Sequence, residues 1–354
     1  MNKAFLGIAV AAVVLVGVML LRGGGEGART PPPDAKQPVP ASSSKNSSDI
    51  VLSIVPGAKR EAAVVPVLGK VSPLISEIRT ARDYKPIFDR LRALGTPTAE
   101  ERYVLATMLA RCAKVTDRKE QPSPYKVDTE SKERFAASLS PKAPNRDKRL
   151  AAFDLAMRDN CAGFEGIAAT EQEIRELIKR AAAEGDPKAQ ASELTREVDD
   201  ARRNEKGEVD YMKIAAISDD QIERFKRIVG SGDARALVDV IQVFGWNANV
   251  HLRGPDDAPI DSMTLYYAAT LAACDLGYPC GPDSPIVAGG CAFQGQCDSA
   301  DYRDYVLFYQ LPPGNAQLVT QYQQQLLRVI RDGDWSYFTF QRGPSPNAVI
   351  FRRQ

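Results

Sequence analysis

The chain has 354 residues, of which 44% are hydrophobic and 26% are charged, an ordinary composition for a globular protein. Its 46 Lys and Arg residues nearly balance its 45 Asp and Glu residues, which leaves a net charge of +1. Such a balance creates no global field to attract nucleic acid, and the sequence contains no P-loop or Gly-x-Gly-x-x-Gly motif. We therefore expect neither nucleic acid nor a nucleotide as a partner.

Uncharged apolar residues fill positions 4–21, and Arg22 and a run of glycines follow them directly. At ~1.5 Å per residue, a helix of this length spans roughly 27 Å, close to the ~30 Å hydrocarbon core of a bilayer. Cleaved signal peptides have shorter apolar regions of about 7 to 15 residues and an Ala-x-Ala-like cleavage site. We therefore expect residues 1–22 to form a transmembrane signal anchor that contacts the lipid bilayer through residues 4–21. A cleaved signal peptide is the alternative.

The next stretch is poor in features that support folding. Residues 23–49 are rich in Gly, Pro and Ser, and residues 50–69 are interrupted by Pro56 and Pro66. A segment such as residues 23–49 cannot bury enough apolar surface to form a stable core. We expect residues 23–69 to be a disordered tether between the anchor and a folded body.

Helical signals predominate over residues 70–245, which we expect to form a helical, repeat-like domain. Thr98 and Glu101 have the spacing of a capping box, in which each side chain bonds the backbone amide of the other residue. They predict a helix that ends near Ala113. Further helices are expected over about residues 131–139 and 146–158.

Two later helical units share one pattern. Each opens on a capping box, Thr170–Glu173 or Ser218–Gln221, and its helix ends at a Gly-Asp pair, Gly185-Asp186 or Gly232-Asp233. Each aspartate is placed to cap the helix that follows. Corresponding positions of the two units are 47 to 48 residues apart. On the polar faces, acids precede bases by four residues at Glu171/Arg175, Glu176/Arg180 and Glu223/Arg227.

This helix–Gly-Asp–helix pattern, AAAEGDPKAQA in particular, resembles Sel1 and tetratricopeptide-type repeats. The resemblance implies stacked helix pairs whose inner surface binds peptide. Stacking also follows from the periodicity, because one such unit cannot bury its apolar face alone. We expect an all-α fold of stacked helical hairpins, as an irregular repeat or bundle. A plain bundle without a groove is the alternative.

An even number of cysteines after an export signal indicates disulfides and an oxidising compartment. The six cysteines are Cys112, Cys161, Cys274, Cys280, Cys291 and Cys297. The first two lie near the ends of predicted helices, which favours a bond between them. The last four have two C-x5-C spacings, whereas zinc modules favour about two to four residues between paired ligands. We expect Cys274–Cys280 and Cys291–Cys297, with the crossed pairing as the alternative.

Residues 246–354 are expected to form a cysteine-containing helical region that is continuous with the preceding domain. Helices are expected over about residues 263–276, 284–293 and 315–331, and short extended segments at 338–340 and 349–351. The sequence motif ACDLGYPCG…CAFQGQC, followed by a terminal helix, resembles a motif of a set of uncharacterised bacterial envelope proteins. That resemblance supports an architecture and a location only. We expect a single-pass protein of the bacterial inner membrane with its C-terminal body in the periplasm.

The sequence contains one histidine, His251, and no recognisable catalytic constellation. Asp256, Asp257 and Asp261 could orient the imidazole, but no Gly-x-Ser-x-Gly or comparable nucleophile motif accompanies it. His251 is therefore interpreted as a polar loop residue between helices. No catalytic, cofactor-binding or metal-binding residue is predicted.

These observations predict a protein that acts by protein–protein interaction or scaffolding, with another envelope protein or a peptide as its partner. A cell-wall (glycosidic) hydrolase with paired carboxylates is the alternative, because two catalytic acids can lie far apart in a sequence. A third interpretation is a spacer that has no ligand.

Overall fold

The computed structural model describes residues 71–117, 129–157, 160–205, 207–210, 213–246, 250–252 and 262–342. The predicted anchor at residues 1–22 and the predicted tether at residues 23–69 lie outside these ranges. The expected extended segment at residues 349–351 lies outside them too. Within the described ranges, no helix is both long enough and apolar enough to cross a bilayer.

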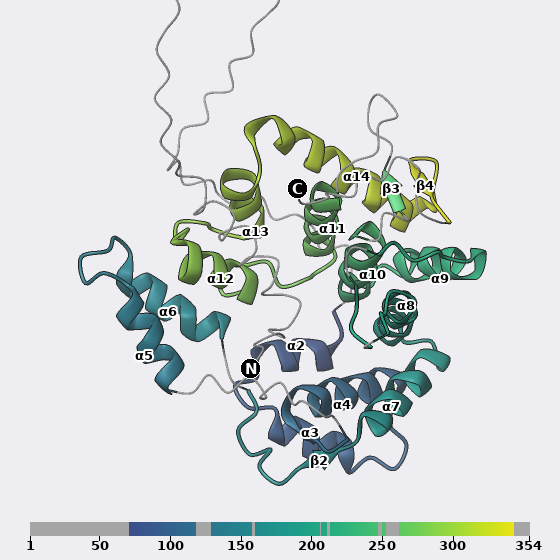
Figure 1. The fold of residues 1–354 in the computed structure, drawn as a ribbon, viewed down its shortest axis with the longest axis horizontal. Coiled ribbons are helices and arrows are strands. Elements are labelled where there is room, and N and C mark those ends of the chain that lie inside the picture. The colour runs from purple at the N-terminus through teal and green to yellow at the C-terminus, as the bar shows by residue number, and fades with distance from the viewer. Residues whose placement is uncertain are drawn as a thin grey trace, which may run out of the picture. The chain divides into compact units, whose positions relative to one another are not determined.

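Helices dominate the described residues, as the sequence predicts (Figure 1). The first helices are α2 (Pro73–Thr80), α3 (Lys85–Arg92), α4 (Ala99–Cys112), α5 (Thr129–Ser138) and α6 (Arg146–Ala156). The middle ones are α7 (Glu171–Ala183), α8 (Pro187–Ala201), α9 (Asp219–Gly230) and α10 (Ala234–Trp246). The last are α11 (Ser262–Asp275), α12 (Pro285–Gln294), α13 (Tyr302–Tyr305) and α14 (Ala316–Asp332). A π-helical turn, η1 (Val306–Gln310), and a 3-10 turn, η2 (Pro313–Asn315), separate α13 from α14.

The capping residues predicted from the sequence begin the helices where they were expected. Thr98, Thr170 and Ser218 each accept a hydrogen bond from the backbone amide three residues later, and the Glu or Gln at that position returns one. Asp186 and Asp233 cap α8 and α10 in the same way. Each capped amide would otherwise lack a partner in the first turn, and a cap is worth about 1 kcal/mol.

Strands are few and very short in the described residues. Lys114–Val115 (β1) pairs in parallel with Ala168–Ala169 (β2). Val250–Leu252 (β3) pairs antiparallel with Phe338–Phe340 (β4), with His251 opposite Thr339. The interpretation of His251 as a loop residue is therefore wrong. The residue lies in a strand because Val250–Leu252 pairs with Phe338–Phe340, and its neighbour Val250 is buried in the core.

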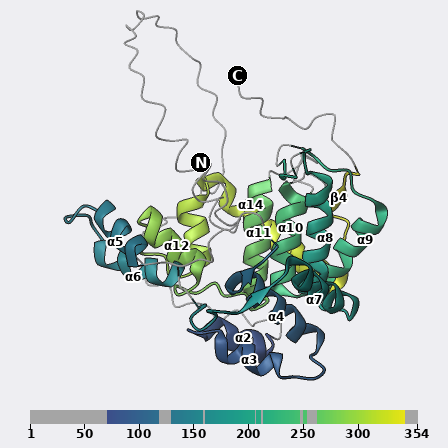
Figure 2. The same ribbon diagram turned by 60° about the horizontal axis from the view of Figure 1, so that its bottom comes forward.

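The main core is built by α8, α9, α10, α11 and α14, with β3 and β4 at one end. Helices α14, α11, α10 and α8 lie side by side (Figure 2), and each packs against the next. The largest fully buried side chains of this core include Phe225, Phe244, Leu265 and Tyr322. Helix α10 lies almost wholly before the domain boundary predicted after residue 245, and α11 lies wholly beyond it, yet both contribute to this one core.

Helices α5 and α6 form a separate small core with α12 (Figure 1). Phe135 of α5 stacks on Phe153 of α6 with ring centroids 4.5 Å apart, and Phe293 of α12 meets both rings edge-on. Arg149 adds a hydrogen bond of 2.8 Å from its Nε to the carbonyl oxygen of Ala292. This contact joins the predicted helical domain to the predicted cysteine-containing region.

Candidate functional site

All six cysteines are oxidised in pairs, and the pairing is the one preferred from the sequence. Cys112–Cys161 joins the end of α4 to the segment before β2, and the other two bonds each close a short loop at the end of a helix. Because no thiol is free, a cysteine nucleophile is excluded for the oxidised protein.

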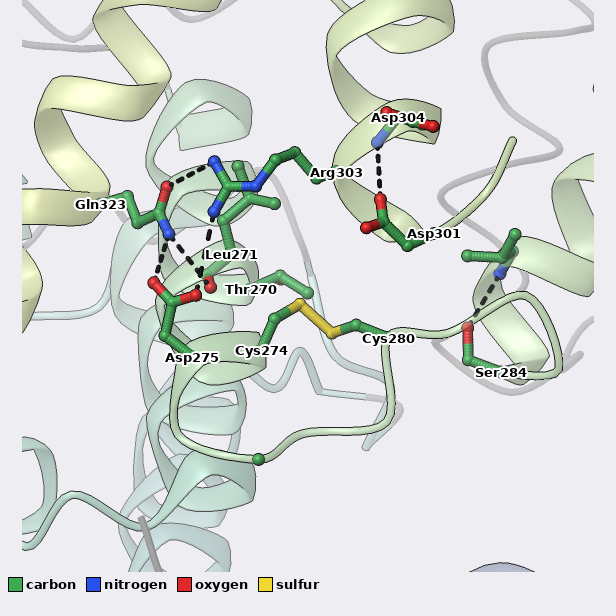
Figure 3. The surroundings of a disulfide bond; sticks show 12 residues. Thr270, Leu271, Cys274, Asp275, Cys280, Ser284, Asp301, Arg303, Asp304 and Gln323 are labelled. Atoms are coloured by element: carbon green, nitrogen blue, oxygen red, sulfur yellow. Dashed lines mark hydrogen bonds and ion pairs between the residues drawn. A yellow bond between two sulfur atoms is a disulfide. The ribbon is translucent and has the colours of Figure 1, made fainter. Parts of the chain in front are cut away.

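A polar network lies beside the Cys274–Cys280 bond (Figure 3). Gln323 of α14 donates from Nε2 to Asp275 Oδ2 at 2.5 Å, and its Oε1 accepts a hydrogen bond from Arg303 at 3.2 Å. Burial raises the pKa of the Asp275 carboxyl, although Gln323 and Arg303 act in the opposite direction. These contacts tie α11, α13 and α14 together next to the disulfide, so they fix the packing of this region.

The two Gly-Asp pairs meet at one lysine. Asp186 and Asp233 use one carboxylate oxygen, Oδ1, as a helix cap and the other, Oδ2, to bind Lys188 Nζ, at 3.0 and 3.4 Å. Glu100 of α4 contacts the same ammonium at 3.2 Å, and the Tyr103 ring lies 5.8 Å away. The Lys188 side chain is only 6% exposed, so three carboxylates surround a buried charge.

This arrangement makes Lys188 a structural cation. Burial alone would lower the pKa of Lys188, but the carboxylates of Asp233, Asp186 and Glu100 raise it above its ordinary value. A catalytic lysine needs the opposite shift, because only the neutral amine is a base or a nucleophile. Lys188 therefore links α4, α8 and the start of α10 and stays protonated near neutral pH.

Three carboxyls have pKa values raised by burial, namely Asp199, Asp239 and Asp275. Each faces an arginine, and none of them lines either of the two clefts described below. In the described part of the chain, no group of three or more His, Cys, Asp or Glu side chains is arranged to hold a metal ion.

An open cleft of about 310 Å³ lies between α7, α8 and α9. Its lining residues are Lys179, Ala182 and Ala183 from α7, Gln190, Glu193 and Glu197 from α8, and Arg224, Arg227 and Ile228 from α9. The volume is at the lower end of the range for ligand sites, about 300 to 1,000 Å³.

Helical periodicity places the polar residues of α8 at the cleft. Ala191, Leu194 and Val198 are buried in the main core. Gln190, Glu193 and Glu197 each precede one of these positions by one residue, so they form the adjoining stripe of the same helix. Burial of the apolar residues fixes the orientation of α8 about its axis, so that the polar stripe faces α7 and α9.

A second, shallower groove of about 490 Å³ lies where η1 approaches α14. Leu307, Ala316, Gln317, Thr320, Gln321 and Gln324 line it, and none of these side chains is charged. Phe308 and Tyr309 of the same π-helical turn are 49% and 43% exposed. π-Helical turns often occur at functional sites, but neither Phe308 nor Tyr309 is among the residues that line this groove.

None of the cleft residues is predicted as a site from the sequence. The four-residue spacing predicts that Arg227 pairs with Glu223 and Arg180 with Glu176, but Glu223 contacts Lys226 at 2.8 Å and Glu176 contacts Lys179 at 3.5 Å. Residues three and four apart lie on the same helix face, so lysine at the nearer position competes for the same acid. The expected pair Glu171–Arg175 is present at 3.1 Å.

Comparisons with protein-family models, with curated proteins and with solved structures found no match to this chain. The resemblance to Sel1 and tetratricopeptide-type repeats and the resemblance to envelope proteins with a cysteine cassette therefore stay predictions from the quoted motifs. The cleft is interpreted below from its own chemistry.

Proposed function

We propose that the protein is a non-catalytic interaction or scaffold protein that holds a partner protein in the cleft between α7, α8 and α9. The observation that carries this proposal is the cleft itself. Helices from both Gly-Asp units present charged side chains and the exposed Ala183 to solvent at one place. In this proposal α7 to α10 act as two stacked, repeat-like hairpins, and Lys188 fixes their relative position.

The proposal is tested by site-specific photo-crosslinking in living cells. A photoreactive amino acid replaces Ala183, an exposed residue that lines the cleft, and in a matched control it replaces Arg328, an exposed residue of α14. We expect a discrete adduct with another polypeptide for the probe at position 183 and none at position 328. Equal adducts at both positions, or none at either, would contradict a partner held in the cleft.

The alternative, a glycosidic hydrolase, has less support. Such an enzyme needs one carboxylic acid that stays protonated and a second carboxylate at a set distance across the substrate. Two acids do line the cleft, but Glu193 binds Arg196 at 2.8 Å and Glu197 binds Arg224 at 2.8 Å. Both carboxylates are therefore engaged by arginines of the protein itself, and neither faces the other across the cleft as a free acid.

We further propose that residues 4–21 anchor the protein in a bacterial inner membrane and that the folded body lies in the periplasm. The complete pairing of six cysteines supports this location, because disulfides persist mainly in oxidising compartments. Protease added to intact spheroplasts is expected to digest the body. A body that is protected until the membrane is permeabilised would place it on the cytoplasmic side.

A further inference from the structure

The acids that line the cleft are already neutralised by arginines. Glu197 receives a 2.8 Å ion pair from Arg224, and the amide of Gln221 adds a hydrogen bond of 3.3 Å. Glu193 is held by two nitrogens of Arg196, at 2.8 and 3.3 Å. That hydrogen bonding raises the pKa of Arg196, as expected when the charged pair is the stable form.

The remaining charge in the cleft is positive. Lys179 has a contact of 3.5 Å to Glu176, but both side chains are about half exposed, and such pairs contribute little. Arg227 is exposed, and among the described residues it makes no ion pair, because the neighbouring Glu223 is bound by Lys226. These two cations come from different helices that line the cleft, α7 and α9.

We propose that the cleft selects an acidic segment of the partner protein and binds one of its carboxylates through Arg227 and Lys179. This inference rests on the proposed function and specifies that the bound segment of the partner is acidic. Arginine presents a planar fork of donors that matches a carboxylate, and lysine adds a mobile point charge. Ala182 and Ala183 provide the apolar contact beside these charges. The whole chain carries a net charge of only +1, so binding of an acidic peptide requires a local site of this kind.

The test uses the full chain in detergent micelles and a fluorescein-labelled hexaglutamate peptide, with binding followed by fluorescence anisotropy. We expect saturable binding that weakens as salt is added, and no saturable binding of a hexalysine peptide. Arg227→Gln and Lys179→Gln are each expected to weaken binding by about tenfold, as for loss of a charge-assisted hydrogen bond. Arg180→Gln is the matched control, since Arg180 is exposed on α7 next to Lys179 but does not line the cleft.

Three results would overturn the inference. Hexaglutamate could fail to bind, hexalysine could bind as well as hexaglutamate, or Arg180→Gln could weaken binding as much as Arg227→Gln. Unfolding midpoints of all variants are measured alongside, and the two single variants on different helices guard against misfolding of one. If the photo-crosslink at position 183 forms but hexaglutamate does not bind, the acidic chemistry is wrong and the proposed function stands. If neither occurs, both are wrong.

Discussion

Two adjacent glycines of α12, Gly289 and Gly290, provide a sharp test of the packing around the cysteine region. A Cβ built on Gly290 would lie 2.3 Å from Cε2 and 2.8 Å from Cδ2 of Tyr305, whereas a Cβ on Gly289 meets no atom within 4 Å. The Tyr305 ring is 3% exposed, and its hydroxyl is 3.3 Å from Gln294 Oε1. The ring therefore has no free space into which it could move.

Gly289→Ala should stabilise the protein by about 0.5 to 1 kcal/mol, because alanine restricts the unfolded chain and favours helix. Gly290→Ala gains the same backbone stabilisation, but overpacking against Tyr305 costs about 1 to 3 kcal/mol. The net effect should therefore be a lower free energy of unfolding. The two variants should thus differ by about 1 to 3 kcal/mol in the free energy of unfolding, measured from urea midpoints by circular dichroism. Equal midpoints for the two variants would show that α12 does not approach Tyr305 as described.

Three further perturbations test other parts of the structure. Burial raises the pKa values of Tyr103 and Tyr305 to about 12, above the ordinary value of about 10. The two tyrosines of the unfolded chain therefore lose their protons at a lower pH than those of the folded protein. The stabilisation is fully present below about pH 10 and should fall as the pH rises towards 12. Tyrosinate absorbance should then appear together with unfolding. Removing the Cys112–Cys161 bond, with its sequence separation of 49, should cost about 4 kcal/mol, against about 2 kcal/mol for either bond with a separation of 6. The ranking is checked by thermal unfolding of variants in which both cysteines of one bond are replaced by alanine. It is contradicted if the variant without Cys112–Cys161 unfolds at a higher temperature than the other two. Lys188→Met should destabilise by about 3 to 5 kcal/mol, since it leaves buried carboxylates unpaired, and a variant as stable as the parent would refute the role of this lysine as a structural cation.

Local signals predicted local structure well. The capping boxes at Thr98, Thr170 and Ser218 each involve four consecutive residues, so the sequence contains both partners of every bond. The disulfides within the last four cysteines were predictable for the same reason, since a separation of 6 brings the two sulfurs close at a helix end. The bond between Cys112 and Cys161 was favoured because both cysteines lie near the ends of predicted helices, and the structure contains this bond.

Features that depend on distant partners were not predictable. The strand that contains His251 exists because Thr339 and its neighbours, 88 residues later, pair with it. Lys179 and Arg227 belong to one cleft only because α7 and α9 both pack near α8. Their spacing in the sequence carries no such signal. The meeting of both Gly-Asp units at Lys188 likewise required the three-dimensional arrangement, although the repeated motif itself was visible.

The segment between α4 and β2 is closed at its base in two ways, by the Cys112–Cys161 bond and by the pairing of Lys114 with Ala168. Helices α5 and α6 lie within this closed loop and contact the rest of the protein through α12. A peptide bond cut anywhere between the two cysteines would therefore leave a single covalent molecule until a reductant is added. The disulfide and the strand pairing would keep α4 and β2 joined after such a cut.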